Sequence, residues 1–349
     1  MEVIRTVSRD SVDELLERLG AKLGIDSSTV IPFTDYTDML TTLLSFVAGD
    51  QDKFLVAGHA TPELAIIADR AELKIVEILG ASPFVRHLED ILEAIDSEKA
   101  IVYMANPNLV TGSTHSLAHL DQIARVISKG TLILDEKFFD YYGITGLPLL
   151  EQYEHIVVIR SLTAGFGIGS DQSGYLVGSH RFVNRFREEF AWSRITTTMH
   201  SLVTTTLVNE DVANKRLTQV YDEALRIASE LTQIGVQNRI TSTDFLLLRV
   251  ADPKAVGNQL AAFGAPVENL EGYPDLENYL RYRIQSPLSN DNFMAAFRKM
   301  PPEHYKMDNI DKRAIMFHRP EEKPLHSRNS LTVKSANTGN TKKEVLAAK

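Results

Sequence analysis

The chain has 349 residues, of which 44% are hydrophobic and 24% are charged, and its formal net charge is −9. This balance excludes an intrinsically disordered chain and predicts a globule that is large enough to bury a full core in two parts. The absence of cysteine excludes disulfides, thiolate metal ligands and thiol nucleophiles. Among the ten histidines only His115 and His119 have H-x-x-x-H spacing, and Ser116 stands where the H-E-x-x-H zinc motif has its glutamate, so we expect no metal site.

No apolar run approaches the roughly 20 residues that cross a bilayer. The first twenty residues carry charges where a secretory signal has its apolar stretch, so we expect a cytoplasmic protein with no membrane partner. Charge is uneven along the chain. Residues 319–349 hold seven Lys or Arg against three Glu, a local charge of +4 that leaves −13 for the remainder. That acidic remainder disfavours nucleic acid as a partner.

Strand and helix signals alternate through the first half of the chain. Residues 11–24 begin with a capping box and space their leucines along one helical face. Residues 116–129 predict another amphipathic helix, which Gly130 ends. The β-rich runs lie at 53–57, 74–78, 100–104, 131–135 and 155–160. The stretches between them can hold crossover helices, so we predict an α/β fold with a mainly parallel sheet and helices on both faces.

The second half predicts a smaller α/β domain. A long helix is expected over 211–234, where Gly235 ends it. Strand patterns at 243–250 and 278–285 flank a helical stretch at 253–264, which predicts a βαβ-like unit. We therefore expect an N-terminal helical segment (1–29) that packs with the small domain, a large domain (30–210), the small domain (211–300), and a largely disordered basic tail (301–349) available to a protein partner.

Four ordered segments carry a resemblance to a known family. They read ANPNLVTG at 105–112, LDEKFFDY at 134–141, RSLTAGFGIGSDQSGY at 160–175 and LRYRIQSPLSNDNFMAAFR at 280–298. Together they resemble the fold-type I (class I and II) aminotransferases, and among them the histidinol-phosphate aminotransferases, over about residues 30–298. The resemblance implies the fold of the transferases that depend on pyridoxal 5′-phosphate (PLP), and a homodimer.

The same alignment removes most of the family's cofactor anchors. Ala164 stands at the Schiff-base lysine, and an alanine forms no imine. Gln172 stands at the arginine that holds the cofactor phosphate, and Asp135 alone keeps its place, opposite the pyridine nitrogen. At the remaining positions of the degenerate site, Tyr36 stands at a phosphate-binding glycine and Thr163 lies beside the lost lysine. Asn108 and Leu109 lie in the turn that, in the family, donates a hydrogen bond to the cofactor's phenolic oxygen. Phe138 replaces a tyrosine that also donates to that oxygen.

Two cations accompany this site. Lys137 replaces a small alanine against the cofactor ring, so we expect its side chain to fill the ring's space and to pair with Asp135 on the same strand face. The pair could also serve acid-base chemistry, or Lys137 could be a relocated imine-forming amine. Arg281 aligns with the arginine that binds a substrate carboxylate, and Arg283 replaces it if the register slips by two. A surface arginine on an edge strand explains Arg281 equally well.

Three functions stay open. The first is a pseudoenzyme that serves as a regulatory, scaffolding or partner subunit. The second is a PLP-independent enzyme or binder that holds an amino-acid-like or keto-acid carboxylate in the old cleft, with Arg281 as its anchor. The third is a weak aminotransferase that holds PLP noncovalently. Each lost hydrogen bond to a charged group weakens the binding free energy of the cofactor by roughly 1.5–3 kcal/mol, so we expect no bound cofactor.

Overall fold

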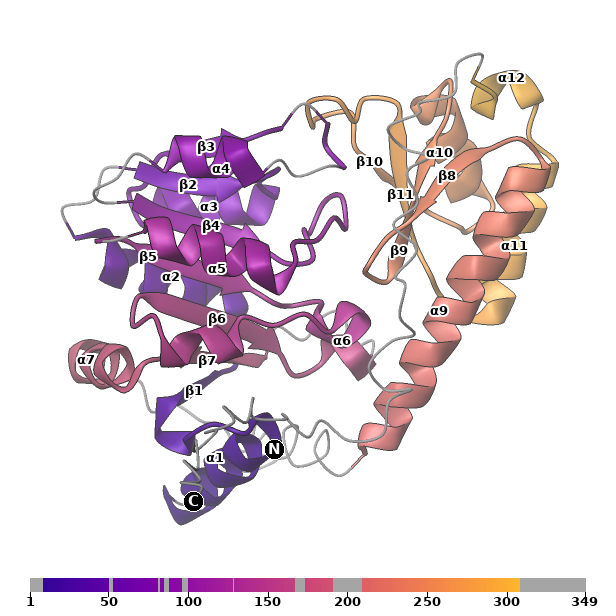
Figure 1. Ribbon diagram of the computed structural model, residues 1–349. Helices are drawn as coiled ribbons and strands as arrows, with labels where there is room; N and C mark the ends of the chain where they lie inside the picture. The colour runs from indigo at the N-terminus through magenta and orange to yellow at the C-terminus, as the bar shows by residue number, and fades with distance from the viewer. Residues whose placement is uncertain are drawn as a thin grey trace, which may run out of the picture.

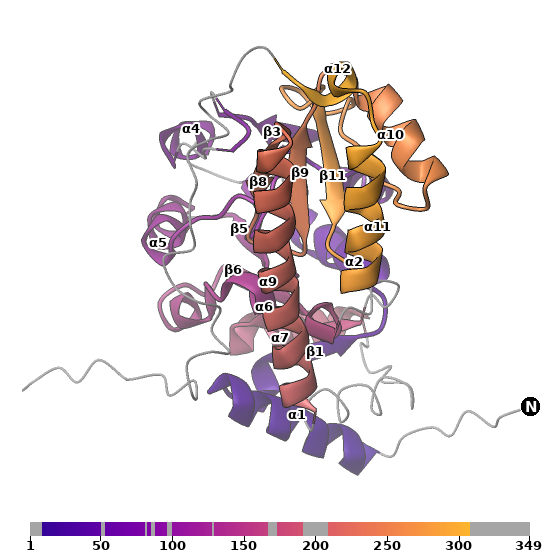
Figure 2. The same ribbon diagram turned by 90° about the vertical axis from the view of Figure 1, so that its right-hand side faces the viewer.

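The computed structural model describes residues 9–49, 53–80, 82–84, 88–95, 100–127, 129–166, 173–190 and 209–307. A large domain surrounds a seven-stranded sheet, and a smaller domain surrounds a four-stranded sheet (Figure 1). The long helix α9 (Glu210–Gln233) runs beside the small domain and reaches down toward the large one, and Figure 2 shows it side by side with α11 (Pro287–Arg298). Within these residues no helix has the length and apolar character to span a membrane.

The large sheet is mainly parallel, as predicted. Its strand order is β1-β7-β6-β5-β4-β2-β3. The neighbours from β3 to β6 pair in parallel, whereas β7 runs antiparallel to β6 and β1 runs antiparallel to β7. The strands are β1 (Val30–Phe33), β2 (Lys53–Ala57), β3 (Ile75–Ile78), β4 (Ala100–Ala105), β5 (Thr131–Asp135), β6 (Ile156–Ser161) and β7 (Gly174–Gly178). The inner strands read as unbroken apolar runs because both of their faces are buried.

Helices cover both faces of this sheet. One face carries α1 (Arg9–Leu23), α4 (Leu88–Ala94) and α5 (Leu117–Val126), and the other carries α2 (Tyr36–Ala48), α3 (Pro62–Arg70) and α7 (His180–Phe190). The expected packing of the N-terminal helix with the small domain is wrong. Leu16 and Leu19 of α1 share a buried cluster with strands of the large sheet. Helical periodicity identified the buried face of α1, but it holds no information about which domain that face meets.

The small domain is built on an antiparallel sheet of order β10-β11-β9-β8. Its strands are β8 (Gln237–Ile240), β9 (Phe245–Arg249), β10 (Glu268–Asn269) and β11 (Tyr279–Arg283), with helices α9, α10 (Pro253–Ala262), α11 and α12 (Pro302–Tyr305). The predicted βαβ-like unit is therefore wrong in its strand direction. After α10 the chain passes through β10 and a loop, so β11 enters the sheet opposite to β9.

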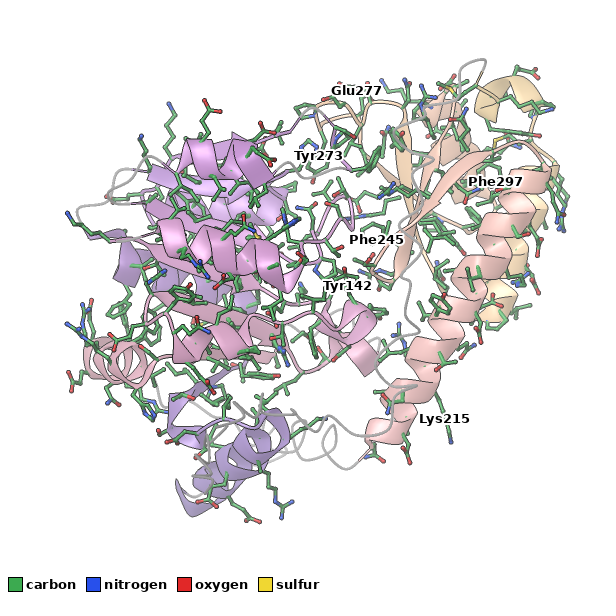
Figure 3. All side chains as sticks on the ribbon, in the orientation of Figure 1. Tyr142, Lys215, Phe245, Tyr273, Glu277 and Phe297 are labelled. Carbon is green, nitrogen blue, oxygen red and sulfur yellow. The ribbon has the colours of Figure 1, made fainter. Side chains whose placement is uncertain are left out.

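The small sheet separates a helix-covered face from a face that meets the large domain. Side chains of β8, β9 and β11 pack against the four helices on the first face. On the second face, Phe245 and Leu247 of β9 join Phe84 and Val110 from loops of the large domain. Figure 3 places Phe245 and Tyr273 of the small domain, and Tyr142 of α6 (Phe139–Tyr142), along this boundary. The site expected from the sequence lies at the same boundary, whereas the predicted tail lies outside the described residues from 308 onward.

Candidate functional site

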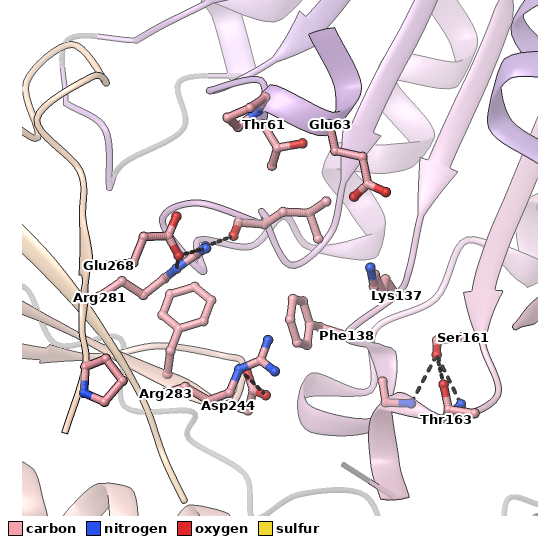
Figure 4. Close-up of a pocket in the computed structure, with 15 residues that line it drawn as sticks. Thr61, Glu63, Lys137, Phe138, Ser161, Thr163, Asp244, Glu268, Arg281 and Arg283 are labelled. Atoms are coloured by element: carbon pink, nitrogen blue, oxygen red, sulfur yellow. Dashed lines mark hydrogen bonds and ion pairs between the residues drawn. The ribbon is translucent and has the colours of Figure 1, made fainter. Parts of the chain in front are cut away.

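A cleft of about 430 Å³ lies between the two domains (Figure 4), and we call it the interdomain cleft. The volume is in the range of small-molecule sites. Most of the residues singled out in the sequence meet here: Leu109, Lys137, Phe138, Thr163 and Ala164 from the large domain, and Arg281 and Arg283 from the small one. Asn108 and Asp135 are not among the lining residues. Gln172 lies outside the described residues.

The Asp135 carboxylate is fully buried and is held by two tyrosines. The hydroxyls of Tyr36 and Tyr103 donate to its Oδ2 at 2.6 and 2.5 Å. The backbone N–H of Lys137 donates to Oδ1 at 2.9 Å. Burial, and then the Asp135 charge, raise the pKa of both phenols well above the ordinary value, so both remain protonated donors. We call these three side chains the Asp135 cluster.

Strand register and helix packing assemble the Asp135 cluster. On β4 and β5, Tyr103 is level with Ile133 and Ala105 is level with Asp135, so Tyr103 and Asp135 point to the same face of the sheet. Tyr36 is the first residue of α2, after an N-cap in which the Asp35 side chain accepts from the N–H of Asp38 at 2.8 Å. The apolar face of α2 packs on that same sheet face, which brings its first residue to the end of β5.

Lys137 does not form the expected charge pair with Asp135. The strand ends at Asp135, so the alternation of faces along β5 does not extend to Lys137. Its Nζ lies 5.0 Å from the centroid of the Tyr36 ring, within the range of a cation–π contact. Figure 4 shows Lys137 on the same side of the interdomain cleft as Glu63, whose Oε1 accepts from the Thr37 hydroxyl at 2.8 Å. Lys137 is thus a cation of the cleft wall rather than the partner of a buried carboxylate.

Ala164 begins the short 3-10 helix η3 (Ala164–Phe166), and its backbone is tightly held. Its N–H donates to Ser161 Oγ at 3.0 Å, and its carbonyl accepts from the Tyr141 hydroxyl at 3.1 Å. Arg216 of α9 donates to the same hydroxyl at 2.8 Å. Burial is the main cause that raises the pKa of Tyr141 to about 12, so this phenol stays neutral. Position 164 is therefore fixed by contacts from the large domain and from α9.

The two arginines of β11 differ in how far they are already engaged. Arg281 donates to Glu268 through Nε at 2.8 Å, and through Nη1 to the Leu109 carbonyl at 2.5 Å. Its guanidinium also lies 4.9 Å from the centre of the Phe245 ring. Arg283 has 59% of its side chain exposed and forms one ion pair, at 3.3 Å, with Asp244. Arg283 is therefore the more available of the two.

Asp244 closes the small-domain side of the interdomain cleft. Its side chain is only 7% exposed, and within the described part of the chain its Oδ1 has no hydrogen-bond partner. Burial is the largest influence and raises the pKa of this carboxyl, whereas the charge of Arg283 acts in the opposite direction.

Sequence reasoning missed several of these groups and misplaced one. Tyr103 reads as part of an apolar strand, yet a phenol inside a strand that is buried on both faces was a usable signal for a buried hydrogen bond. Glu268, Asp244 and Arg216 gave no such signal. The Asn108 side chain stabilises its own loop, because its Oδ1 accepts hydrogen bonds from the N–H groups of Val110 and Thr111 at 3.1 and 2.9 Å.

Comparison with known proteins agrees with this architecture. Residues 3–268 match the family model described as aminotransferase class I and II. The chain is 26% identical over 286 residues to the histidinol-phosphate aminotransferase of Chlorobaculum tepidum, which covers 80% of each protein. Identity to the enzyme of the same name from Caldanaerobacter subterraneus is 26% over 221 residues, which span 61% of each.

Solved structures share the fold at low sequence identity. The histidinol-phosphate aminotransferase of Clostridium acetobutylicum superposes with a TM-score of 0.74 at 18% identity, over 83% of this chain and 89% of that one. A protein from Burkholderia pseudomallei described as a putative aminotransferase gives 0.71 at 18% identity, over 82% and 87%. The chain therefore has the fold-type I architecture of the PLP-dependent aminotransferases, as the resemblance implied.

Proposed function

We propose that this chain, which belongs to the class I and II aminotransferase family, holds no PLP, transfers no amino group and acts as a regulatory or partner subunit. The observation that carries the proposal is the Asp135 carboxylate, whose two oxygens already accept hydrogen bonds from the protein itself. In an aminotransferase this carboxylate must face the ring nitrogen of the cofactor. The residues present do not fit that group, because the Tyr36 hydroxyl takes the place of the ring's donor.

The other positions of the site support the same proposal. Ala164 has no amine with which to form an imine. Leu109 and Phe138, both on the wall of the interdomain cleft, have no side-chain donor for the cofactor's phenolic oxygen. Hydrogen bonds to charged groups contribute roughly 1.5–3 kcal/mol each, so losing several of them together with a covalent bond weakens PLP retention by many orders of magnitude.

The test is a titration of the purified full-length chain with PLP. We expect no imine absorption band. After borohydride reduction, the amount of PLP adduct in the intact mass spectrum should be no greater for the wild type than for the Lys137→Arg variant. The variant controls for surface lysines, which react weakly with any aldehyde. A stoichiometric adduct that maps to Lys137, or steady conversion of an amino donor to its keto product, would refute the proposal and favour a noncanonical aminotransferase.

We also propose a homodimer, which the family resemblance implies. Light scattering coupled to size-exclusion chromatography tests this directly. A mass of about 39 kDa at all concentrations would be that of a single chain and would contradict it.

A second candidate function is the binding of an amino-acid-like or keto-acid carboxylate without PLP. It is favoured by the cations of the interdomain cleft, Lys137 and Arg283, which face the same space. Arg281, the residue expected from the sequence, already holds Glu268 and the Leu109 carbonyl, so a ligand must compete for it. A thermal-shift screen with amino and keto acids tests this candidate. Stabilisation by a ligand that is lost in Arg283→Ala and kept in Arg281→Ala would support this candidate. A screen without hits would count against it and leave the subunit proposal as the one that remains.

A further inference from the structure

We infer that Tyr36 is a built-in substitute for the cofactor ring, so that loss of Tyr36, and not return of the lysine, is what reopens the site. This inference rests on the proposed function and deepens it. It names one side chain as the barrier and one chemical class as the ligand that its removal admits: a planar aromatic ring with an O–H or N–H donor directed at Asp135.

The contacts of the Tyr36 ring are those of a bound aromatic ligand. Its hydroxyl donates to Asp135 at 2.6 Å. The Lys137 amine lies 5.0 Å from its centroid, and the Phe33 ring meets it edge-on with centroids 6.4 Å apart. The residue is 5% exposed although it is the first residue of a surface helix. An acceptor at one end and a cation near the ring hold the phenol in one orientation.

Tyr36 also lines a small cavity that adjoins the interdomain cleft. This cavity, beside the sheet, is lined by Tyr36, Arg160 and Ser173, and it shares Lys137 and Ser161 with the interdomain cleft. Removal of the phenol would therefore enlarge this small cavity toward the end of β5, where Asp135 lies. The enlarged space would have an acceptor at its inner end and a cation on its wall.

Tyr103 does not have this position, although it donates to the same carboxylate oxygen. It belongs to the inner strand β4, its ring packs near Phe54 with centroids 6.3 Å apart, and it does not line either cavity. Tyr103→Phe removes one donor to Asp135 without removing a ring. It is therefore the matched control, because it perturbs the Asp135 cluster but leaves the site filled.

The test uses 4-methylphenol, which is the tyrosine side chain as a free molecule, together with PLP. We expect 4-methylphenol to raise the melting temperature of full-length Tyr36→Gly by a few degrees and to leave the wild type and Tyr103→Phe unchanged. Tyr36→Gly should bind PLP noncovalently and more tightly than the wild type does, but only weakly, because Leu109 and Phe138 still supply no donor to the cofactor. Quenching of intrinsic fluorescence compares the two proteins. In Tyr36→Gly/Ala164→Lys the introduced amine should condense with the PLP aldehyde, lose water and give an imine band.

Ala164→Lys alone can overturn the inference even if Tyr36→Gly fails to fold. With Tyr36 in place, this variant should show no imine band, and formation of one would overturn the inference. A folded Tyr36→Gly that responds to neither 4-methylphenol nor PLP would overturn it as well, while the wild type's failure to bind PLP would still support the proposed function. PLP binding by the wild type would instead count against the proposed function itself, so the two failures are distinguishable.

Discussion

Each domain contains a buried aspartate, and the hydrogen-bonding capacity of the two is satisfied to very different degrees. Asp135, from the large domain, accepts three hydrogen bonds from the protein. Asp244, from the small domain, pairs with one largely exposed arginine, and one of its oxygens has no partner among the described residues. Buried polar atoms normally find a partner. The difference indicates that the protein's own side chains close the large-domain side, whereas the small-domain side still has hydrogen-bonding capacity for a ligand or water.

The largest expected effect is the loss of the carboxylate in the closed region. Asp135→Ala leaves the hydroxyls of Tyr36 and Tyr103 buried without their acceptor, and it opens a small void beside them. We expect the free energy of unfolding to fall by about 3–5 kcal/mol. Urea unfolding followed by far-UV circular dichroism measures this. Asp244→Ala is the matched control, and an equal loss in that variant would remove the contrast between the two aspartates.

An intermediate effect comes from the two phenols taken one at a time. Tyr36→Phe and Tyr103→Phe each delete one hydrogen bond to the charged Asp135, so each should cost roughly 1.5–3 kcal/mol in the same assay. Both hydroxyls serve one oxygen and lie 3.0 Å apart. The double variant should therefore depart from additivity by about 0.5–3 kcal/mol. Strict additivity would mean that the two phenols do not act as one cluster.

The sequence predicted the frame of the molecule well, because periodicity is a local signal. Residues 53–57 and 131–135 form strands with the predicted bounds, and the helix expected at 211–234 begins and ends within one residue of α9. The antiparallel entry of β11 was not predictable in the same way, since strand direction depends on the path of the intervening chain. β10 has only two residues, too few for a pattern, and three of the four residues of β8 are polar, so β8 gives no strand signal.

The site was predicted as a set of positions but not as a set of contacts. Alignment placed Tyr36 at a phosphate-binding glycine, but it did not show where the new side chain points. The direction of the Tyr36 side chain depends on how α2 packs on the sheet, which is tertiary information. Lys137 was expected beside Asp135 because strand alternation was extended two residues past the end of β5. Sequence reasoning therefore located the departures from the family but not the new partners they acquired.

The smallest effect, and the one most specific to the open region, is the pH dependence that Asp244 contributes. Burial raises its pKa in the folded state, so the folded chain holds this proton more tightly than the unfolded chain. The resulting stabilisation is complete below the unfolded value of about 4 and is lost as the pH rises through the higher folded value. Asp244→Asn lacks this titration. The wild type should therefore lose stability relative to the variant over that interval, because burial disfavours the charged carboxylate and the largely exposed Arg283 offsets this only in part. Melting temperatures of both proteins from acid to neutral pH check the sign. Parallel curves, or a variant that weakens as the pH rises, would show that Asp244 is satisfied by a group beyond Arg283, and the contrast with Asp135 would then lose its basis.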